Sequence, residues 1–183
     1  MALLVGHKAP EFSGLALVGG DALKLTPDNA FKNISSADYK GKWVVLFFYP
    51  LDFTFVCPTE IEDFGKHYDE FKALNCEVIA CSTDSHYSHL AWRSSLPGLK
   101  NLPYPMLADF TRSNAKNFEI LKKETGYALR GLYIIDPNGD LQYTVIHPEK
   151  VGRNSKEVLR VLQALQTDKL TPCNWEAGEK TLN

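Results

Sequence analysis

The residue best placed to do chemistry in this sequence is Cys57, which follows a strand-like apolar run and stands just before a helical pattern. A thiol is nucleophilic as its thiolate, and the first turn of a helix favours negative charge through its dipole and free amides. A free thiol has a pKa of about 8.5, so complete ionisation at pH 7 gains at most roughly 30-fold in rate, or about 2 kcal/mol. Acidity alone is therefore insufficient, and other residues must complete the site.

Two residues shortly before Cys57 suit a sulfur that attacks an O–O bond. Such an attack builds negative charge on the departing oxygen, which fixed donors in a dry pocket must stabilise. Thr54 offers a hydroxyl for this purpose, and Pro50 lacks an amide proton and can shield the sulfur from water. We expect these three residues to share one pocket.

The other three cysteines have different settings. Four cysteines are too few for a disulfide scaffold in a chain of 183 residues, and none forms a C-x-x-C metal pair. Cys76 and Cys81 stand at a helix-to-strand junction and in a strand, where a thiol is usually a small core hydrophobe. Cys173 belongs to the region from about Asp168 onward, which loses hydrophobic periodicity and is predicted to be a tail.

His86 and His89, with Cys81 and Asp84 nearby, have a helical spacing that metal ligands also use. No further clustered ligand and no known metal-binding spacing accompanies them. We therefore expect packing or solvated histidines and no metal site.

The strands that must position Cys57 are indicated by apolar runs. The continuous run 43–49 predicts a central strand that is covered on both faces, and 78–81 predicts a second strand. The runs 132–135 and 141–146 flank the turn-rich segment 136–140 and predict an antiparallel hairpin.

Three helices are expected between and after these strands. Apolar residues from Ile61 to Leu74 recur at three- and four-residue steps and predict one amphipathic helix, with Pro58 in its first turn. A second helix is predicted over 86–94, and a third begins at Ser155, which is placed to cap it. Strands that alternate with helices imply a mixed α/β sheet sandwiched by helices.

Length and charge limit the alternatives. A chain of 183 residues with 44% hydrophobic content can bury one full core, so we expect one domain over residues 1–167 and a tail over 168–183. The 20 basic and 22 acidic residues nearly balance and form no basic block, which gives no footprint for nucleic acid or an anionic membrane. The start lacks a signal-peptide pattern, and no apolar stretch reaches membrane-spanning length, so we expect a cytoplasmic protein.

The segment 48–60, Phe-Tyr-Pro-Leu-Asp-Phe-Thr-Phe-Val-Cys-Pro-Thr-Glu, resembles the peroxiredoxin signature Pro-x-x-x-Thr-x-x-Cys. The resemblance covers nearly the whole chain and points to the typical two-cysteine type, similar to the alkyl hydroperoxide reductase C subunit and thioredoxin peroxidase. It implies a thioredoxin-like fold with no cofactor and no metal. It also implies an antioxidant thiol peroxidase that reduces hydrogen peroxide and alkyl hydroperoxides.

The same resemblance assigns roles to individual residues. The active site would consist of Pro50, Thr54, Cys57 and Arg130. Thr54 and Arg130 would bind the peroxide and stabilise the leaving oxygen, and Cys57 would become a sulfenic acid. Arg153 would pair with Glu60 and Arg130. Without the resemblance, both arginines could be ordinary surface cations, because spacing alone cannot join residue 57 to residue 130.

Cys173 lies where the family places its resolving cysteine, although a proline precedes it and Trp175 follows after only one residue, instead of the usual Cys-Pro-x-x-Trp. On a mobile tail it could reach the sulfenic acid of a partner subunit and close a Cys57–Cys173 disulfide. Thioredoxin or a flavoprotein disulfide reductase would then reduce that disulfide. The implied assembly is a homodimer, with five dimers in a decameric ring. An inert Cys173 would instead leave a one-cysteine mechanism.

Segment 96–101 bears on resistance to peroxide, and Trp92 bears on packing around the reactive loop. The segment 96–101 replaces the Gly-Gly-Leu-Gly insert of peroxide-sensitive members, and no C-terminal Tyr-Phe helix follows, so we expect a robust, bacterial-type enzyme. Trp92 matches a family aromatic that packs near the reactive loop, although core filling would explain it equally well.

Two other functions compete with peroxide reduction. One is a chaperone-like holdase or a peroxide-signalling relay that acts as an oligomer. The other is a thiol-disulfide oxidoreductase, but such proteins typically use C-x-x-C, and here Thr59 and Glu60 follow Cys57 at the second and third positions.

Overall fold

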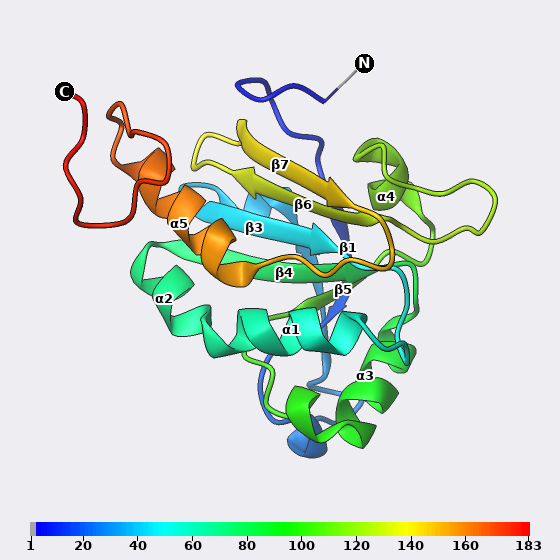
Figure 1. Ribbon diagram of the computed structural model, residues 1–183. Helices are drawn as coiled ribbons and strands as arrows, with labels where there is room; N and C mark the ends of the chain where they lie inside the picture. Colours follow the sequence, from blue (N-terminus) through cyan, green and yellow to red (C-terminus); the bar gives the residue numbers. More distant parts are fainter. Residues whose placement is uncertain (1–2) are drawn as a thin grey trace.

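A computed structural model describes residues 3–183, so the first two residues of the predicted 1–167 domain lie outside it. Its strands form one mixed sheet in the order β2-β1-β5-β4-β3-β6-β7 (Figure 1). The strands are β1 (Ser13–Leu17), β2 (Phe31–Ser35), β3 (Trp43–Phe48), β4 (Cys76–Ser82), β5 (Met106–Ala108), β6 (Arg130–Ile135) and β7 (Leu141–His147).

Helices connect these strands and cover the sheet. They are α1 (Cys57–Lys66), α2 (Tyr68–Ala73), α3 (His86–Ser95), α4 (Ser113–Asn117) and α5 (Ser155–Gln166), with short 3-10 turns η1 (Ala22–Lys24), η2 (Ser36–Tyr39) and η3 (Pro97–Leu99). Figure 1 shows α1, α2 and α5 together on one face, with α4 at the far end of the sheet. The predicted α/β class with a mixed, helix-flanked sheet is confirmed.

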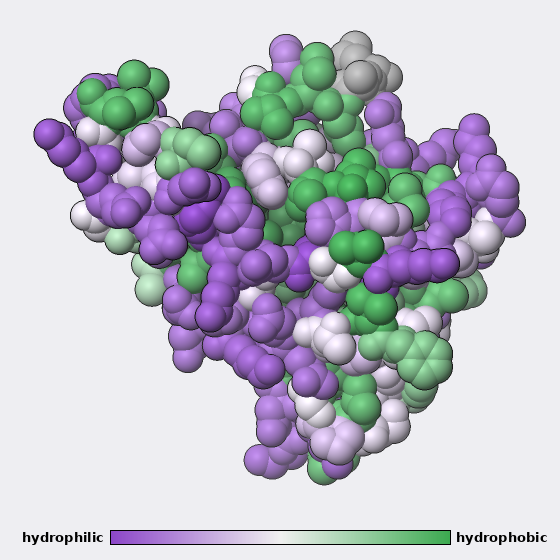
Figure 2. Space-filling model, in the orientation of Figure 1, coloured by the Kyte–Doolittle hydropathy of each residue, from purple (hydrophilic) through white to green (hydrophobic). Residues whose placement is uncertain are grey.

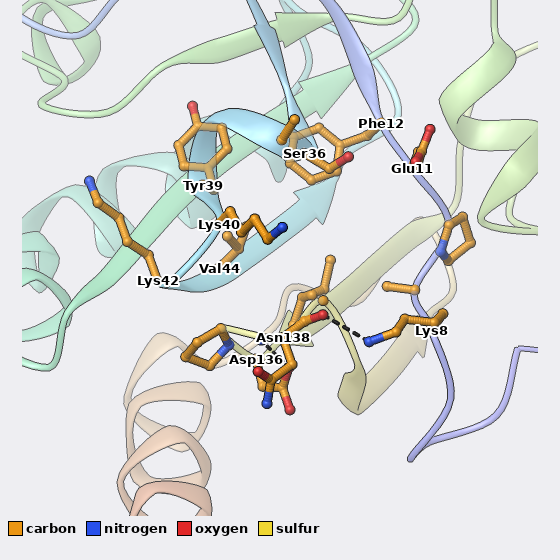
Figure 3. Close-up of a pocket in the computed structure, with 16 residues that line it drawn as sticks. Lys8, Glu11, Phe12, Ser36, Tyr39, Lys40, Lys42, Val44, Asp136 and Asn138 are labelled. Carbon is orange, nitrogen blue, oxygen red and sulfur yellow. Dashed lines mark hydrogen bonds between the residues drawn. The ribbon is translucent and has the colours of Figure 1, made fainter.

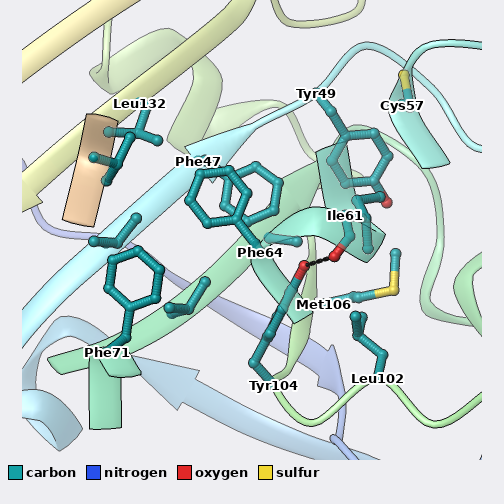
Figure 4. Packing of buried hydrophobic residues seen from close by; sticks show 14 of the residues in the cluster. Phe47, Tyr49, Cys57, Ile61, Phe64, Phe71, Leu102, Tyr104, Met106 and Leu132 are labelled. Atoms are coloured by element: carbon teal, nitrogen blue, oxygen red, sulfur yellow. Dashed lines mark hydrogen bonds between the residues drawn. The ribbon is translucent and has the colours of Figure 1, made fainter. Parts of the chain in front are cut away.

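The central strand β3 explains the continuous apolar run 43–49. It pairs with β4 in parallel and with β6 in antiparallel orientation, so both of its edges are bonded. Alternate side chains enter two cores: Val45 and Phe47 face the α1 side, whereas Leu46 and Phe48 face the other. Phe47 stacks on Phe64 of α1 with ring centroids 4.6 Å apart (Figure 4). A strand with buried side chains on both faces needs apolar residues at every position.

The single helix predicted after Cys57 is wrong, because the structure contains two helices. His67 leaves helical geometry with φ −99° and ψ 7°, and its ring Nδ1 lies 2.6 Å from Glu70 Oε1. The apolar residues Phe64 and Phe71, one on each side of the break, are both fully buried. Periodicity cannot detect the break, because both helices present apolar residues to the same core.

The other predicted elements agree with the structure, with one shift at α5. The 43–49 and 78–81 strands, the 86–94 helix and the antiparallel hairpin are all present as β3, β4, α3 and β6–β7. The N-cap of α5 is Asn154, whose side chain accepts from the amides of Lys156 and Glu157. Ser155 lies inside the helix instead, and its hydroxyl donates to the Asp63 carboxylate of α1. Sequence analysis missed β1, β2, β5 and α4.

Two negative findings apply to the described part of the chain. None of its helices combines the length and apolar character that a membrane crossing requires. After α5, the described range 167–183 contains no helix or strand.

Candidate active site

Cys57 is the first residue of α1 and is fully buried. It belongs to the apolar cluster between the sheet and the helices, beside Tyr49 and Ile61 (Figure 4). The residue before it is Val56, whose apolar side chain cannot cap the helix. The sulfur therefore lies at the positive end of the helix dipole, where the amides of Thr59 and Glu60 donate to the Val56 carbonyl.

Arg130 lies directly beside this sulfur. Its Nη1 is 3.5 Å from Cys57 Sγ, although 73 residues separate the two in the chain. Arg130 is 2% exposed and its guanidinium is held from two sides, because Nη1 donates to Glu60 Oε2 at 2.6 Å and Nε donates to the Glu149 carbonyl at 2.8 Å. A fixed, buried cation is thus aimed at the position where charge would develop on an oxygen attacked by the sulfur.

Glu60 joins Arg130 to Arg153 in a buried ion network. The backbone amide and Nε of Arg153 each lie 2.7 Å from Glu60 Oε1, and Nη2 lies 3.0 Å from Oε2. Burial raises the pKa of Glu60, but the guanidinium of Arg153, and then that of Arg130, outweigh it and hold the pKa below its ordinary value. Glu60 is therefore ionised at neutral pH and orients both arginines. Arg130 and Arg153 are both buried, so neither is a surface cation.

Pro50 and Thr54 lie in the loop that joins β3 to α1. Pro50 is buried at the end of β3, and Thr54 is partly buried. The Thr54 hydroxyl donates to the Leu51 carbonyl at 2.8 Å. Its proton is therefore engaged, and the oxygen is left to accept a hydrogen bond, which differs from the donor role that sequence analysis expected.

The structure also shows residues that sequence analysis missed. Asp52, in the same loop, accepts a hydrogen bond from Nδ1 of His89 at 2.9 Å. The sequence spacing of His89 indicates only packing or metal ligation, and Asp52 belongs to no periodic pattern. Among residues 3–183, no group of three His, Cys, Asp or Glu side chains could hold a metal ion.

Cys76 and Cys81 are buried in β4. Burial raises the pKa of Cys76 to about 12 and that of Cys81 well above the usual thiol range. Both are protonated core thiols at neutral pH. Trp92 is 3% exposed and packs its ring 6.0 Å from both Tyr49 and Phe53, so it lies against the Cys57 loop.

Cys173 is exposed and lies far from the Cys57 end of α1 in the same chain. Figure 1 shows the tail beyond α5 beside the α2 end of the molecule, whereas α1 begins at the opposite side. The tail is anchored by Trp175, which is 4% exposed and whose carbonyl accepts from Arg160 Nη1 at 2.9 Å. The structure thus brings Cys57, Glu60, Arg130 and Arg153 together and leaves Cys173 apart.

A separate pocket of about 310 Å³ lies between the N-terminal segment, η2 and the β6–β7 turn (Figure 3). Tyr39, Lys40 and Asp136 are among the residues around it. Its lining, drawn from the described residues, includes neither Cys57 nor any residue that sequence analysis assigned to the site. This pocket is therefore not the candidate active site.

Comparison with known proteins agrees with this geometry. Residues 5–144 match the model of the AhpC/TSA family. The chain is 48% identical to peroxiredoxin 1 of Brugia malayi, over 96% of this chain and 76% of that protein, and 47% identical to thioredoxin peroxidase of Trypanosoma brucei rhodesiense, over 97% and 89%. The solved structure of Mycobacterium bovis AhpC superposes with a TM-score of 0.88 at 44% identity, covering 96% of this chain and 100% of that one.

A family match of this extent, with relatives at this identity, defines the class: the chain belongs to the AhpC/TSA family, the peroxiredoxins. Its sheet and helices have the thioredoxin-like fold of these proteins, as sequence analysis expected.

Proposed function

We infer that this chain is a thiol-dependent peroxidase that reduces hydrogen peroxide and alkyl hydroperoxides. The observation that carries this function is the buried Cys57 sulfur at the start of α1, 3.5 Å from Arg130 Nη1. Family membership and the names of the relatives support it, and they do not favour the holdase or relay alternative.

The first step oxidises Cys57. Its thiolate attacks the terminal oxygen of the peroxide, so an S–O bond forms while the O–O bond breaks. The departing oxygen takes up the proton that the thiol released, giving water or an alcohol, and the sulfur becomes a sulfenic acid. Arg130 stabilises the charge on that oxygen, Thr54 Oγ accepts the O–H of the incoming peroxide, and Pro50 keeps water from the sulfur.

The second step uses Cys173 of a partner subunit. Its thiolate attacks the sulfenic sulfur, an S–S bond forms while the S–O bond breaks, and the departing hydroxide takes up the proton that the Cys173 thiol released, giving water. The tail that carries Cys173 lies beside the α2 end of the molecule, whereas α1 begins with Cys57 on the opposite side, and this arrangement supports an intersubunit disulfide (Figure 1). Thioredoxin or a flavoprotein disulfide reductase would return both thiols, and residues 168–183 would act as the tail that carries the resolving thiol.

A homodimer would form along β7, the last strand in the sheet order. Ile146 is 48% exposed, and Figure 2 shows hydrophobic side chains over the β6–β7 region, whereas the outer surfaces of α1 and α5 are mostly hydrophilic. A second copy paired with β7 would cover this surface and continue the sheet through the backbone of this edge strand.

A decamer requires another apolar interface. Four aromatic side chains are exposed around the active-site loop and α3 or on the β5–α4 connection, namely Phe53, Phe55, Tyr87 and Phe110. Phe55 is 94% exposed, which is unusual for an aromatic side chain on a single soluble subunit. We propose that these aromatics join dimers into the ring, and that the chain acts in the cytoplasm, where its free thiols are expected.

The mechanism can be tested by non-reducing electrophoresis after one equivalent of hydrogen peroxide. Wild-type protein is expected to form a covalent dimer, and Cys173→Ser is expected to remain monomeric while still consuming one equivalent. Cys57→Ser should consume none, and retained peroxide consumption in that variant would refute the peroxidase assignment. A wild-type band that stays monomeric would instead support the one-cysteine mechanism. Cys76→Ala is the matched control and should behave as wild type.

A further inference from the structure

A buried polar cluster lies behind the Cys57 loop, and the proposed reaction does not use it. The Asp52 carboxylate accepts three hydrogen bonds, from the Tyr49 hydroxyl at 2.7 Å, the Ser88 hydroxyl at 2.8 Å and His89 Nδ1 at 2.9 Å. The side chains of Asp52 and His89 are 1% and 0% exposed. Such a carboxylate is retained in a core only when its partners compensate its desolvation.

Asp52 ties the loop down through its backbone as well. Its amide donates to Asp84 Oδ2 at 2.9 Å, and the Ser82 hydroxyl donates to that same oxygen at 2.9 Å. Side chain and main chain of one loop residue are thus bonded to Tyr49 just after β3, to Asp84 in the turn after β4, and to α3. The loop between Pro50 and Thr54 is therefore held at its midpoint.

The backbone of Phe53, the residue after Asp52, has a conformation that is unfavourable by itself. Phe53 has φ +56°, the left-handed conformation that costs a residue with a side chain roughly 1 kcal/mol or more. Such a conformation persists where surrounding contacts determine it, and Thr54 follows directly. Relaxation at Phe53 would redirect the Thr54 backbone and move its hydroxyl relative to Cys57.

Two further contacts make the anchor rigid. His89 Nε2 lies 3.4 Å from the Leu107 carbonyl, so the ring spans from the loop to β5 in the sheet. Burial, and then the charge of Asp52, raise the pKa of Tyr49 well above its usual range, so its hydroxyl keeps its proton and remains a donor. Both contacts connect the loop to elements that the core holds in place.

We propose that Asp52 and His89 are positioning residues for peroxide reduction. They hold the 50–56 loop, which contains Pro50 and Thr54 and leads into Cys57 at the start of α1, in one conformation before peroxide arrives. Preorganisation of this kind acts on the reaction with peroxide, because a misplacement of about 1 Å can reduce a rate by roughly 100-fold. The inference rests on the proposed function and goes beyond it.

The test compares two reactions of the same sulfur in Asp52→Asn, His89→Gln and the double variant. The first is the second-order reaction with hydrogen peroxide, followed by stopped-flow tryptophan fluorescence. The second is alkylation of Cys57 by iodoacetamide, which needs the thiolate but not the donors and acceptors that bind a peroxide. We expect each single variant to lose roughly 10- to 100-fold in the peroxide rate while alkylation stays within about threefold. The double variant should lose no more than the worse single variant.

Asp109→Asn is the matched control, because Asp109 is a buried carboxylate whose side chain accepts from the amides of Asn114 and Ala115 of α4 and not from the loop. It should lower the melting temperature without changing the peroxide rate. If the Asp52 variant does not fold, Ser88→Ala removes one of the three donors and should give a smaller loss of the same kind.

Three results would overturn the inference: an unchanged peroxide rate in folded variants, a parallel fall in peroxide and alkylation rates, or additive losses in the double variant. Failure of the proposed function is distinct, since it would appear as wild-type protein that does not consume peroxide.

Discussion

The guanidinium of Arg130 lies 3.5 Å from the sulfur of Cys57, and the same Nη1 donates to Glu60 Oε2 at 2.6 Å. One nitrogen thus connects the sulfur at the start of α1 to a carboxylate one turn later in that helix. The proposed site therefore depends on a charge network as much as on the thiol.

Removing the Arg130 guanidinium should slow peroxide reduction far more than it slows other reactions of the thiol. Loss of one preorganised donor to a developing oxyanion typically costs about 100- to 1,000-fold in rate, and we expect this loss for Arg130→Met. The peroxide rate of Arg130→Lys should lie between those of wild type and Arg130→Met, because an ammonium cannot bond Glu60 and the Glu149 carbonyl in the same geometry. Stopped-flow oxidation of Cys57 measures the effect. The exposed Arg112→Met is the control, and an equal loss there would contradict the assignment.

Thr54 should act through its oxygen rather than through its proton. Its hydroxyl already donates to the Leu51 carbonyl, so a peroxide O–H would donate to it. Thr54→Val keeps the shape and removes the acceptor, and we expect a loss of roughly 10- to 100-fold in the peroxide rate. Thr54→Ser should keep most of the activity. A Val variant as fast as the Ser variant would show that the hydroxyl is not used.

Glu60→Gln should destabilise the fold as well as the site. The change leaves Arg130 and Arg153 buried without their anion, and breaking a buried ion pair in this way costs about 3–5 kcal/mol. Urea unfolding measures the loss. Glu157→Gln removes an exposed carboxylate from Arg160 and should cost less than about 1 kcal/mol. Equal losses in the two variants would mean that burial of the network contributes nothing.

The same carboxylate predicts a pH dependence of stability. Its pKa in the folded protein lies below the unfolded value of about 4.3, so the folded state holds the ionised form. The stabilisation is therefore complete above the unfolded pKa and is lost as the pH falls through the folded pKa. The free energy of unfolding, measured in urea from pH 7 downward, should decline below about pH 4.3, and Glu60→Gln should lack this part of the decline. If Glu60→Gln lost stability with falling pH as steeply as wild type does, Glu60 would be excluded as the source of the decline.

The buried thiols of Cys76 and Cys81 should not react with an alkylating agent while the protein is folded. Because burial raises the pKa of Cys76 to about 12 and that of Cys81 higher than usual, neither should react with iodoacetamide at pH 8. Mass spectrometry of peptides from native protein should show label on Cys173 and Cys57, and on Cys76 and Cys81 only after denaturation. Labelling of Cys81 at the rate of Cys173 in native protein would contradict this assignment.

Local patterns in the sequence determined the elements nearest to Cys57. The continuous apolar run 43–49 had to become a strand buried on both faces, and the three- and four-residue steps after Cys57 had to become helix, because each pattern matches one backbone period. The break at His67 escaped the same reasoning, since the apolar period continues across it. The short strand β5, only three residues long, contains too few residues to show a period.

The tertiary structure alone decided which distant side chains meet. Arg130 reaches Cys57 because β6 lies beside β3 in the sheet, and strand order is a property of the whole chain rather than of any segment. The Asp52–His89 contact likewise depends on how α3 packs against the loop. The resemblance named Arg130 and Arg153, but only the structure shows how both guanidinium groups bond the Glu60 carboxylate. Sequence thus determined where the thiol stands in its helix, whereas packing determined the charges that surround it.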